Sequence, residues 1–532
     1  MHLSSDHPAV SAVLPRSLAP LGSVWARTDV RNYLVLAAVA LAVMTPELVF
    51  GLHFSDSAPY NIVWTAQFGD AWGRGEIYPR WLPGSFEGLG APTFYFYPPL
   101  AYWLTGALHA LGIEVTRAIT IAETVLLFAS GVAMERWLRW RGTPSLLAAA
   151  LYMALPYRLT DIYTRGALAE HAAFVWLPLI AMGIEALPRR WAPPLLAASV
   201  AGLLLTHLPT SVLALVFLMI PLGIRRVLQD RGALVPGAAA GLLGAGLAAF
   251  FLLPALTLQN EIQSNLLWTA HFTVSNWYIW NWDGASWQAF SPFLIACAGV
   301  VVLATRGGRW WFWVTLAPAL AAFGLLPILG LPGLSTVQFP WRAIGIVLLL
   351  GMTAFAVQRP SRRVMLLAVC LLASGWISES GQMIQNIASG HRPDVRGLER
   401  TLQDAAEYLP QGLQAGVTDR QRDPHLGPYA AYPRSSVMSV IQPGVHTFGR
   451  AAFPIWRVVH DGREVPYVGP LITFQGPAGE YRIERRWIWQ EKVGAAISIM
   501  SLMAVLLMAF WAMRLRGPRG RGWLEAGEPL AS

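Results

Sequence analysis

Long runs of apolar residues, separated by short polar loops, make up most of this chain of 532 residues. A helix needs roughly 17–25 mostly apolar residues to cross the hydrocarbon core of a bilayer. By that measure the pattern predicts about twelve membrane-spanning helices, at residues 33–52, 118–138, 143–158, 167–187, 193–207, 209–224, 233–257, 288–305, 310–330, 341–357, 362–378 and 493–514. The sequence therefore predicts an α-helical polytopic membrane protein.

Two long polar stretches interrupt this pattern. Residues 53–117 form a first loop that is too rich in Trp and Tyr for a disordered segment. Within it, Pro98–Gly112 is expected to lie as a helix in the membrane interface without crossing. Residues 379–491 end in short alternating runs joined by Asp-Gly and Pro-Ala-Gly turns, which predict strands. We expect a small domain there, of α/β or β-sandwich type.

Arginine positions predict the orientation of the chain, because cytoplasmic loops carry an excess of Lys and Arg. With the N-terminus in the cytoplasm, most arginines of the short loops between spans fall inside, and both termini are cytoplasmic. The inside arginines are Arg136, Arg139, Arg141, Arg189, Arg190, Arg225, Arg226, Arg231, Arg306, Arg309, Arg359, Arg362, Arg363, Arg514, Arg516, Arg519 and Arg521. The location predicted is a bacterial cytoplasmic (inner) membrane.

Four parts follow from this topology. They are a cytoplasmic tail at residues 1–31, a transmembrane core at 32–378, a periplasmic domain at 379–491, and a last span with a basic tail at 492–532. The tail lacks a short apolar core and a cleavage site, so residues 33–52 are interpreted as an uncleaved signal anchor.

Composition supports the membrane assignment and excludes other classes. The chain is 55% hydrophobic and 13% charged, with a mean hydropathy of +0.45, whereas soluble chains carry roughly 25% charged residues. The net charge of +9 comes almost entirely from arginine, and the arginines between apolar runs are interpreted as topology determinants, so no nucleic-acid partner is predicted. Cys297 and Cys370 both lie in apolar runs, which excludes a disulfide framework.

Four arginines break the orientation rule because they fall on the outer side: Arg80, Arg158, Arg165 and Arg342. A single such arginine can simply extend to the interface or cap a helix end. Guanidinium groups also bind phosphate in bidentate geometry, and lipid phosphates lie at this depth. We therefore predict that the four arginines bind a lipid-linked phosphate.

Asp56 is the candidate catalytic residue, since it follows the first span at the bilayer boundary. A carboxylate there can accept a proton from an attacking hydroxyl as general base. The alternatives are that Asp56 makes only a local turn, or that Asp70 or Asp161 takes this role. Asp70 begins a polar run that also fits a solvated helix face, and Asp161 lies three residues from Arg158, which favours an ion pair.

Glu170, His171 and His207 are further candidates for substrate binding, because ionisable groups at membrane depth usually face a cavity. Adjacent residues of a regular helix cannot both point at one ion, so no metal site is predicted. A divalent metal at Glu170 and His171 stays as the alternative, and no other cofactor is expected. The tryptophans of a later outer loop fit an aromatic belt, with one or two able to stack on a sugar; they are Trp268, Trp277, Trp280, Trp282 and Trp287.

The donor of any transferred group is predicted to travel in the membrane. The sequence contains no Walker A loop and no dinucleotide fingerprint, and the long loops lie outside the cytoplasm. A polyprenyl-phosphate sugar fits this setting, with its tail in lipid and its phosphate on arginine.

Several stretches carry a family resemblance. YPRWLPGSFEGLGAPTFYFYPPL, PYRLTDIYTRGALAEH and LLTHLP resemble bacterial membrane proteins labelled 6-pyruvoyl-tetrahydropterin-synthase-related, and FPIWRVVHDGREVPYVGPLITFQGPAGEYRIERR resembles the terminal domain of YfhO-like proteins. Both groups are placed with the GT-C class of membrane glycosyltransferases, and the likeness covers about residues 45–515. The resemblance implies that Asp56 acts as base or positions the acceptor. The paired acidic motif usual in that loop is absent, since Ser55 and Ser57 flank Asp56.

The sequence thus predicts a glycosyltransferase that moves a sugar from a polyprenyl-phosphate donor to a lipid, glycan or protein acceptor, with inversion at the anomeric carbon. Two alternatives stay open. One is a flippase or transporter of lipid-linked sugars, which would require ionisable groups or broken helices in the middle of the bundle. The other is a non-catalytic assembly factor for envelope polymers.

Overall fold

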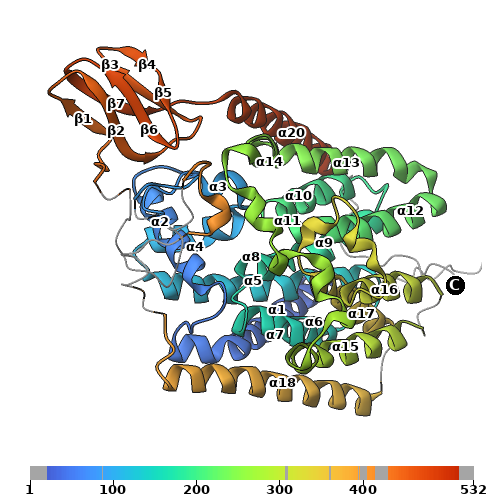
Figure 1. Ribbon diagram of the computed structural model, residues 1–532. Helices are drawn as coiled ribbons and strands as arrows, with labels where there is room; N and C mark the ends of the chain where they lie inside the picture. The colour runs from blue at the N-terminus through green and yellow to red at the C-terminus, as the bar shows by residue number, and fades with distance from the viewer. Residues whose placement is uncertain are drawn as a thin grey trace, which may run out of the picture.

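The computed structural model describes residues 21–86, 88–305, 309–358, 361–393, 395, 404–413, 429 and 431–514. Most of them form helices that run side by side in one body, and a β domain stands at one end of it (Figure 1). The helices are α1 (Leu21–Phe50), α2 (Ala58–Gly73), α3 (Thr93–Phe96), α4 (Leu100–Ala110), α5 (Val115–Trp140), α6 (Leu146–Ala154), α7 (Pro156–Tyr163), α8 (Leu168–Ala173), α9 (Trp176–Glu185), α10 (Ala192–Leu204), α11 (Leu208–Ala214), α12 (Ile220–Gln229), α13 (Leu234–Leu247), α14 (Ala249–Thr257), α15 (Gly284–Thr305), α16 (Arg309–Ala322), α17 (Ile344–Gln358), α18 (Arg362–Ala388) and α20 (Trp489–Arg514).

Eight helical segments of the described chain are long and apolar enough to cross a membrane, so the chain is a multi-pass membrane protein. They are Asp29–Phe50, Val115–Trp140, Leu168–Glu185, Leu208–Gln229, Gly284–Val302, Pro340–Gln358, Arg362–Ala388 and Trp489–Arg514. A ninth arises if Arg231–Leu247 and Ala249–Thr257, which bend by 70°, count as one span. Each agrees with a predicted span.

The predicted number of twelve spans is not confirmed. Residues 143–158, 193–207 and 310–330 are mostly helical, but their longest helices, α6, α10 and α16, have only 9, 13 and 14 residues. Proline explains the first of these, because a residue before proline is driven out of the helical region. Leu155 is extended (ψ 148°) before Pro156, which separates α6 from α7.

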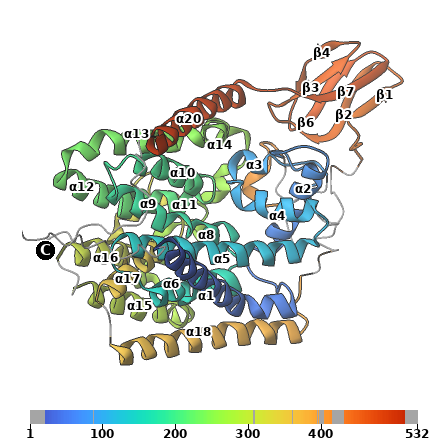
Figure 2. The same ribbon diagram turned by 180° about the vertical axis from the view of Figure 1, so that it is seen from behind.

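The predicted cytoplasmic arginines gather at one end of the body, opposite the β domain. Arg136 and Arg139 both pair with Asp29, and Arg141 and Arg225 pair with Glu185. The last helix, α20, ends on this side (Figure 2). Assignment of this end to the cytoplasm stays a prediction, and the predicted inside arginines Arg306, Arg359, Arg516, Arg519 and Arg521 lie outside the described residues.

The first long loop folds into α2, α3 and α4 at the opposite end, beside the β domain (Figure 1). The segment predicted to lie in the interface without crossing contains α4, which packs against α2. Two glycines allow this close approach: a Cβ on Gly69 would lie 2.9 Å from the Gly106 carbonyl oxygen, and one on Gly106 would lie 2.7 Å from Phe68. The buried hydroxyls of Thr65 and Thr105 meet at 2.9 Å across this contact.

The β domain consists of two antiparallel sheets with strand orders β1-β7-β3-β4 and β2-β6-β5. Apolar side chains of both sheets, including Phe448, Val458 and Ile472, are fully buried between them, as in a sandwich. The predicted start of this region, residue 379, lies inside α18, which runs on to Ala388. The strands are β1 (Val437–Val440), β2 (Gly444–Ala451), β3 (Trp456–His460), β4 (Arg463–Val465), β5 (Tyr467–Val468), β6 (Leu471–Gly476) and β7 (Gly479–Arg485).

Candidate functional site

Between α1 and α2, the chain is hydrogen-bonded through its backbone to the distant segment that follows α7. The Asp56 N–H donates to the Thr164 carbonyl oxygen at 3.3 Å, and the Ser57 N–H donates to the Arg165 carbonyl oxygen at 2.9 Å. These bonds hold the candidate base beside one of the candidate phosphate-binding arginines.

Gly166 makes this approach sterically feasible. Its φ of +59° lies in the left-handed region, which L-residues with a Cβ rarely adopt. A Cβ there would lie 2.2 Å from the Ser55 hydroxyl, closer than any ordinary contact. The Gly166 carbonyl oxygen also accepts from the Asn61 side chain at 2.8 Å, which ties α2 to the same segment.

The buried carboxylate of Glu170 is the centre of the site. It accepts a hydrogen bond of 2.5 Å from the Tyr157 hydroxyl and pairs with Arg165 at 3.0 Å and Arg342 at 3.2 Å. Arg342 lies on the short helix η10 (Pro340–Ala343), far from the others in sequence. The side chain of Glu170 is 2% exposed, so two arginines are held at fixed positions by one desolvated charge.

Asp161 completes this cluster from α7. It pairs with Arg165, four residues later, and not with Arg158, three residues earlier, as the sequence had suggested. Tyr157, Asp161 and Arg165 are spaced by four residues, which places them along one face of a helical turn. Arg158, Arg165 and Arg342 all lie within electrostatic range of the Glu170 carboxylate.

Both arginines beside Glu170 keep N–H groups free for a ligand. Arg342 uses Nε for Glu170, and Nη1 for the Val337 carbonyl oxygen at 2.8 Å and the Gln338 side chain at 3.4 Å. Arg165 uses only Nη1 for its partners. Within the described chain, Nη2 of Arg342 and Nε and Nη2 of Arg165 have no partner and are not fully buried. These donors suit an oxyanion such as a phosphate.

The Asp56 side chain is exposed, and it lies near the side chains of Arg165 and His271. Partial burial raises the pKa of Asp56 above its ordinary value, while Arg165 and His271 lower this pKa. His271 belongs to a run of short helical turns between α14 and α15. A base needs access to its substrate, and this carboxylate has that access next to Arg165.

Two further residues adjoin the cluster on the side of the first loop. His207 lies within electrostatic range of Glu170 and Arg342, and its Nδ1 bonds the Thr210 hydroxyl at 2.7 Å. Burial raises the pKa of Tyr97 to about 12, with Arg342 opposing the rise and Glu170 contributing to it. Tyr97 therefore borders the charged cluster and shields it on one side.

Glu407 extends the surroundings of Tyr97. It lies on η11 (Ala406–Tyr408), in a segment held to the first loop by Asp404, which accepts from Trp64 at 2.8 Å and Thr93 at 2.6 Å. Burial raises the pKa of Glu407 to about 7.

Arg80 does not join the site. Its Nε lies 3.5 Å from Glu491 on α20, and its Nη2 donates to the Phe250 carbonyl oxygen at 2.9 Å. Glu491 also binds Arg485 at 2.6 Å and Tyr95 at 2.8 Å, so Arg80 joins the first loop to the last helix. Its predicted role in phosphate binding is withdrawn.

Arg158 and His171 are also removed from the binding set, because both are buried against protein. Arg158 is 0% exposed, donates to the His171 carbonyl oxygen at 2.9 Å, and lies 4.0 Å from the centre of the Phe174 ring. His171 is turned to the Glu123 carbonyl oxygen at 3.0 Å, away from the partners of Glu170. The described residues contain no group of three or more His, Cys, Asp or Glu side chains placed to hold a metal ion.

Sequence reasoning missed Tyr157, Gln338, Tyr97 and Glu407. Only Tyr157 had a usable signal, its spacing of four from Asp161 and eight from Arg165. The others reach the site through tertiary contacts, which no local sequence pattern predicts.

Fold and site together define a multi-pass membrane protein with an arginine–carboxylate cluster at the end that carries the β domain. No family model and no curated protein matches the chain. Among solved structures it is similar to the arabinofuranosyltransferase AftD from Mycobacteria, with 16% identity and a TM-score of 0.46. The match covers 68% of this chain and 27% of that chain, so the chain spans about a quarter of that protein. A likeness this distant carries no argument about activity, and the family resemblances stay predictions.

Proposed function

We propose that the chain is a membrane glycosyltransferase that takes a sugar from a polyprenyl-phosphate donor, with Asp56 as general base. The observation that carries this proposal is the convergence of three distant parts of the chain: Asp56 is held beside Arg165, and Arg165 shares the carboxylate of Glu170 with Arg342. A lone carboxylate or a lone arginine at a membrane surface would not support it.

The chemistry assigns one role to each group. The Asp56 carboxylate takes the proton of the acceptor hydroxyl, and the acceptor oxygen forms a bond to the anomeric carbon of the sugar. The bond between that carbon and the phosphate oxygen breaks with its electron pair, so the polyprenyl phosphate leaves with an additional negative charge. The free N–H groups of Arg165 and Arg342 stabilise that charge as it develops. Attack opposite the leaving group inverts the anomeric centre.

Glu170 serves this reaction as a positioning residue. Removing the charge of a buried carboxylate would leave two arginines without their common partner, and their side chains would reorient. His207 lies close enough to contribute a further contact to the donor.

Complementation of a deletion strain tests the proposal. Mass spectrometry of lipid-linked sugars and envelope glycans should reveal a product that is lost on deletion and restored by the wild-type chain. Asp56→Asn should fail to restore it while inserting normally, since a general base contributes roughly 10²–10⁴-fold. A deletion that changes no lipid-linked sugar or glycan would contradict the enzyme proposal.

Asp70→Asn is the matched control. Asp70 is a carboxylate of the same loop, 63% exposed and 3.8 Å from His109, so its loss should leave product formation unchanged. If Asp56→Asn restores the product as well as Asp70→Asn does, the base role of Asp56 is excluded.

A second candidate function, transport of a lipid-linked sugar, is favoured by charged groups and broken helices inside the bundle. His53 lies 3.2 Å from the buried Glu47, which is within electrostatic range of Glu123, and α13 and α14 meet at 70°. Transporters place ionisable groups and discontinuous helices at membrane depth in this way. Accumulation of unflipped donor in the deletion strain, with transfer activity intact in its detergent extracts, would select transport.

A further inference from the structure

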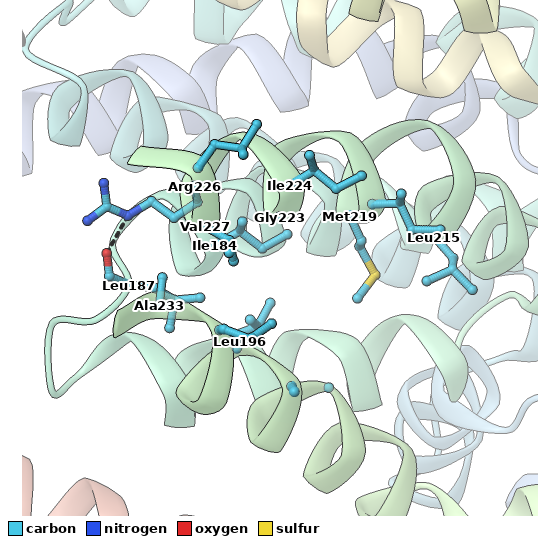
Figure 3. A pocket seen from close by; sticks show the side chains of 16 residues that line it. Ile184, Leu187, Leu196, Leu215, Met219, Gly223, Ile224, Arg226, Val227 and Ala233 are labelled. Carbon is cyan, nitrogen blue, oxygen red and sulfur yellow. Dashed lines mark hydrogen bonds between the residues drawn. The ribbon is translucent and has the colours of Figure 1, made fainter. Parts of the chain in front are cut away.

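A cavity of about 440 Å³ lies at the end of the bundle opposite the β domain, between α9, α10, α12 and α13 (Figure 3). Ligand pockets typically have volumes of roughly 300–1,000 Å³. The lining is apolar except at one place, where Arg226 belongs to it, and the apolar residues include Leu196, Leu215, Met219 and Ile224.

The cavity has the length of a lipid tail. Its lining follows the chain from Leu215 to Leu228, which at 1.5 Å per residue is roughly 20 Å along a helix. Half of a bilayer's hydrocarbon core is roughly 15 Å thick. Large exposed side chains on its rim, Ile224 at 54% and Leu234 at 57%, place it in contact with lipid.

One end of the cavity is strongly basic. The Arg226 guanidinium reaches toward Leu187, whose carbonyl oxygen it binds (Figure 3). Its Nη2 lies 3.5 Å from Asp230. Its Nη1 has no partner in the described chain and is not fully buried. Exposed arginines follow Leu187 and precede Ala233 at the same rim; they are Arg189, Arg190 and Arg231.

We propose that this cavity binds one acyl chain of an anionic phospholipid, with its phosphate held by Arg226 and the arginines of the rim. The apolar length selects a hydrocarbon tail, and the excess of arginine over the neighbouring carboxylate selects an acidic head group. Basic pockets between transmembrane helices bind anionic lipid head groups in this way. The site lies at the other end of the bundle from Glu170 and is independent of the glycosyltransferase proposal.

Two glycines allow the cavity to be filled without disturbing the helices. A Cβ on Gly241 in α13 or Gly223 in α12 would meet nothing within 4 Å, although both residues line the cavity. Leucine is also a better helix former than glycine. Gly375→Leu is the matched control, because Gly375 in α18 is equally unobstructed and lies away from the cavity.

Native mass spectrometry of the purified full-length chain, titrated with phosphatidylglycerol or phosphatidylcholine of equal acyl composition, tests the tail. The wild-type chain should bind one phosphatidylglycerol more tightly than phosphatidylcholine. Gly241→Leu and Gly223→Leu should each abolish that tight event, and Gly375→Leu should keep it. Retention of tight binding in both cavity variants would overturn the proposal.

Charge variants test the head group. Arg226→Gln should lower the affinity for phosphatidylglycerol roughly fivefold, the worth of one arginine at an anionic lipid, and leave phosphatidylcholine unchanged. Arg363→Gln, an exposed arginine of the same end on α18, should have no effect. Equal binding of the two lipids by the wild-type chain would overturn the head-group assignment, as would retention of a polyprenyl phosphate in place of a phospholipid. A structure determined with phosphatidylglycerol present gives a measurement free of variants, and an empty cavity there would refute the proposal.

Discussion

Two buried glutamates of this protein have almost the same partners but different surroundings. Glu170 binds Tyr157, Arg165 and Arg342, whereas Glu491 binds Tyr95, Arg80 and Arg485. Each is thus a carboxylate with one phenol and two guanidinium groups, taken from segments that are distant in sequence.

The two clusters differ in which of their arginines keep N–H groups that are neither bonded nor buried. Around Glu491, Arg80 also binds the Phe250 carbonyl oxygen, and its Nη1 is buried without a partner. Arg485 is 31% exposed, and its guanidinium lies 4.9 Å from the centre of the Trp487 ring. Around Glu170, Nη2 of Arg342 and two nitrogens of Arg165 remain accessible, and the exposed carboxylate of Asp56 is adjacent. The Glu491 cluster therefore joins the first loop and the β domain to α20. The remaining N–H groups of the Glu170 cluster are of the kind that suits an anion.

The largest expected effect separates the two clusters by activity. Arg342→Ala should lower sugar transfer roughly 10²–10³-fold, because it removes a donor aimed at developing charge. Arg80→Ala should change transfer per folded molecule less than tenfold, since Arg80 contacts no part of the site. The measurement is the rate of product formation in membranes, normalised to monodisperse protein. Equal losses in the two variants would remove the distinction between the clusters.

The second effect concerns stability, and here the larger loss is expected at the Glu491 cluster. Glu491→Ala leaves Arg80 and Arg485 facing each other without their carboxylate, and breaking a buried ion pair typically costs roughly 3–5 kcal/mol. The variant should show a lower thermal unfolding midpoint and faster proteolytic release of the β domain. Glu480→Ala is the control, because Glu480 pairs with Arg482 on the domain surface, where ion pairs contribute little. An unchanged midpoint in Glu491→Ala would contradict the joining role.

The sequence predicts features that depend on neighbouring residues better than features that depend on residues far away in the chain. Spans such as Val115–Trp140 depend on local apolar length and were found, while α6 ended early because Pro156 stops it. Arg165 was identified as an exception to the orientation rule, and the structure does place it beside Asp56. Arg80 carried the same signal for a different reason: its partner Glu491 lies 411 positions later in the sequence, and no local pattern distinguishes the two cases.

The third effect tests how the site is held together. Gly166→Ala places a Cβ 2.2 Å from the Ser55 hydroxyl and strains a backbone at φ +59°, so Asp56 should move relative to Arg165. Transfer should fall about tenfold, the consequence of a small misplacement of reacting groups. Adding Ser55→Ala removes the obstructing oxygen and should restore part of the rate. Gly75→Ala is the control for strain alone, since Gly75 has φ +90° and nothing within 4 Å of a Cβ. Loss of the same size in Gly75→Ala would show that the contact with Ser55 is unimportant.

The smallest effect concerns Glu407, which borders the Glu170 cluster through Tyr97. Its pKa is about 7 in the folded chain against an ordinary 4.5. Between those values the folded state binds more protons than the unfolded state, so this group stabilises the fold at low pH, and that contribution is lost as the pH rises through 7. Glu407→Gln, which resembles the protonated form, should unfold at a higher temperature than the wild type at pH 8 and at a similar temperature at pH 5. A difference that is the same at both pH values would mean that Glu407 does not titrate in this window, and its surroundings would then be no more desolvating than those of an exposed glutamate such as Glu464.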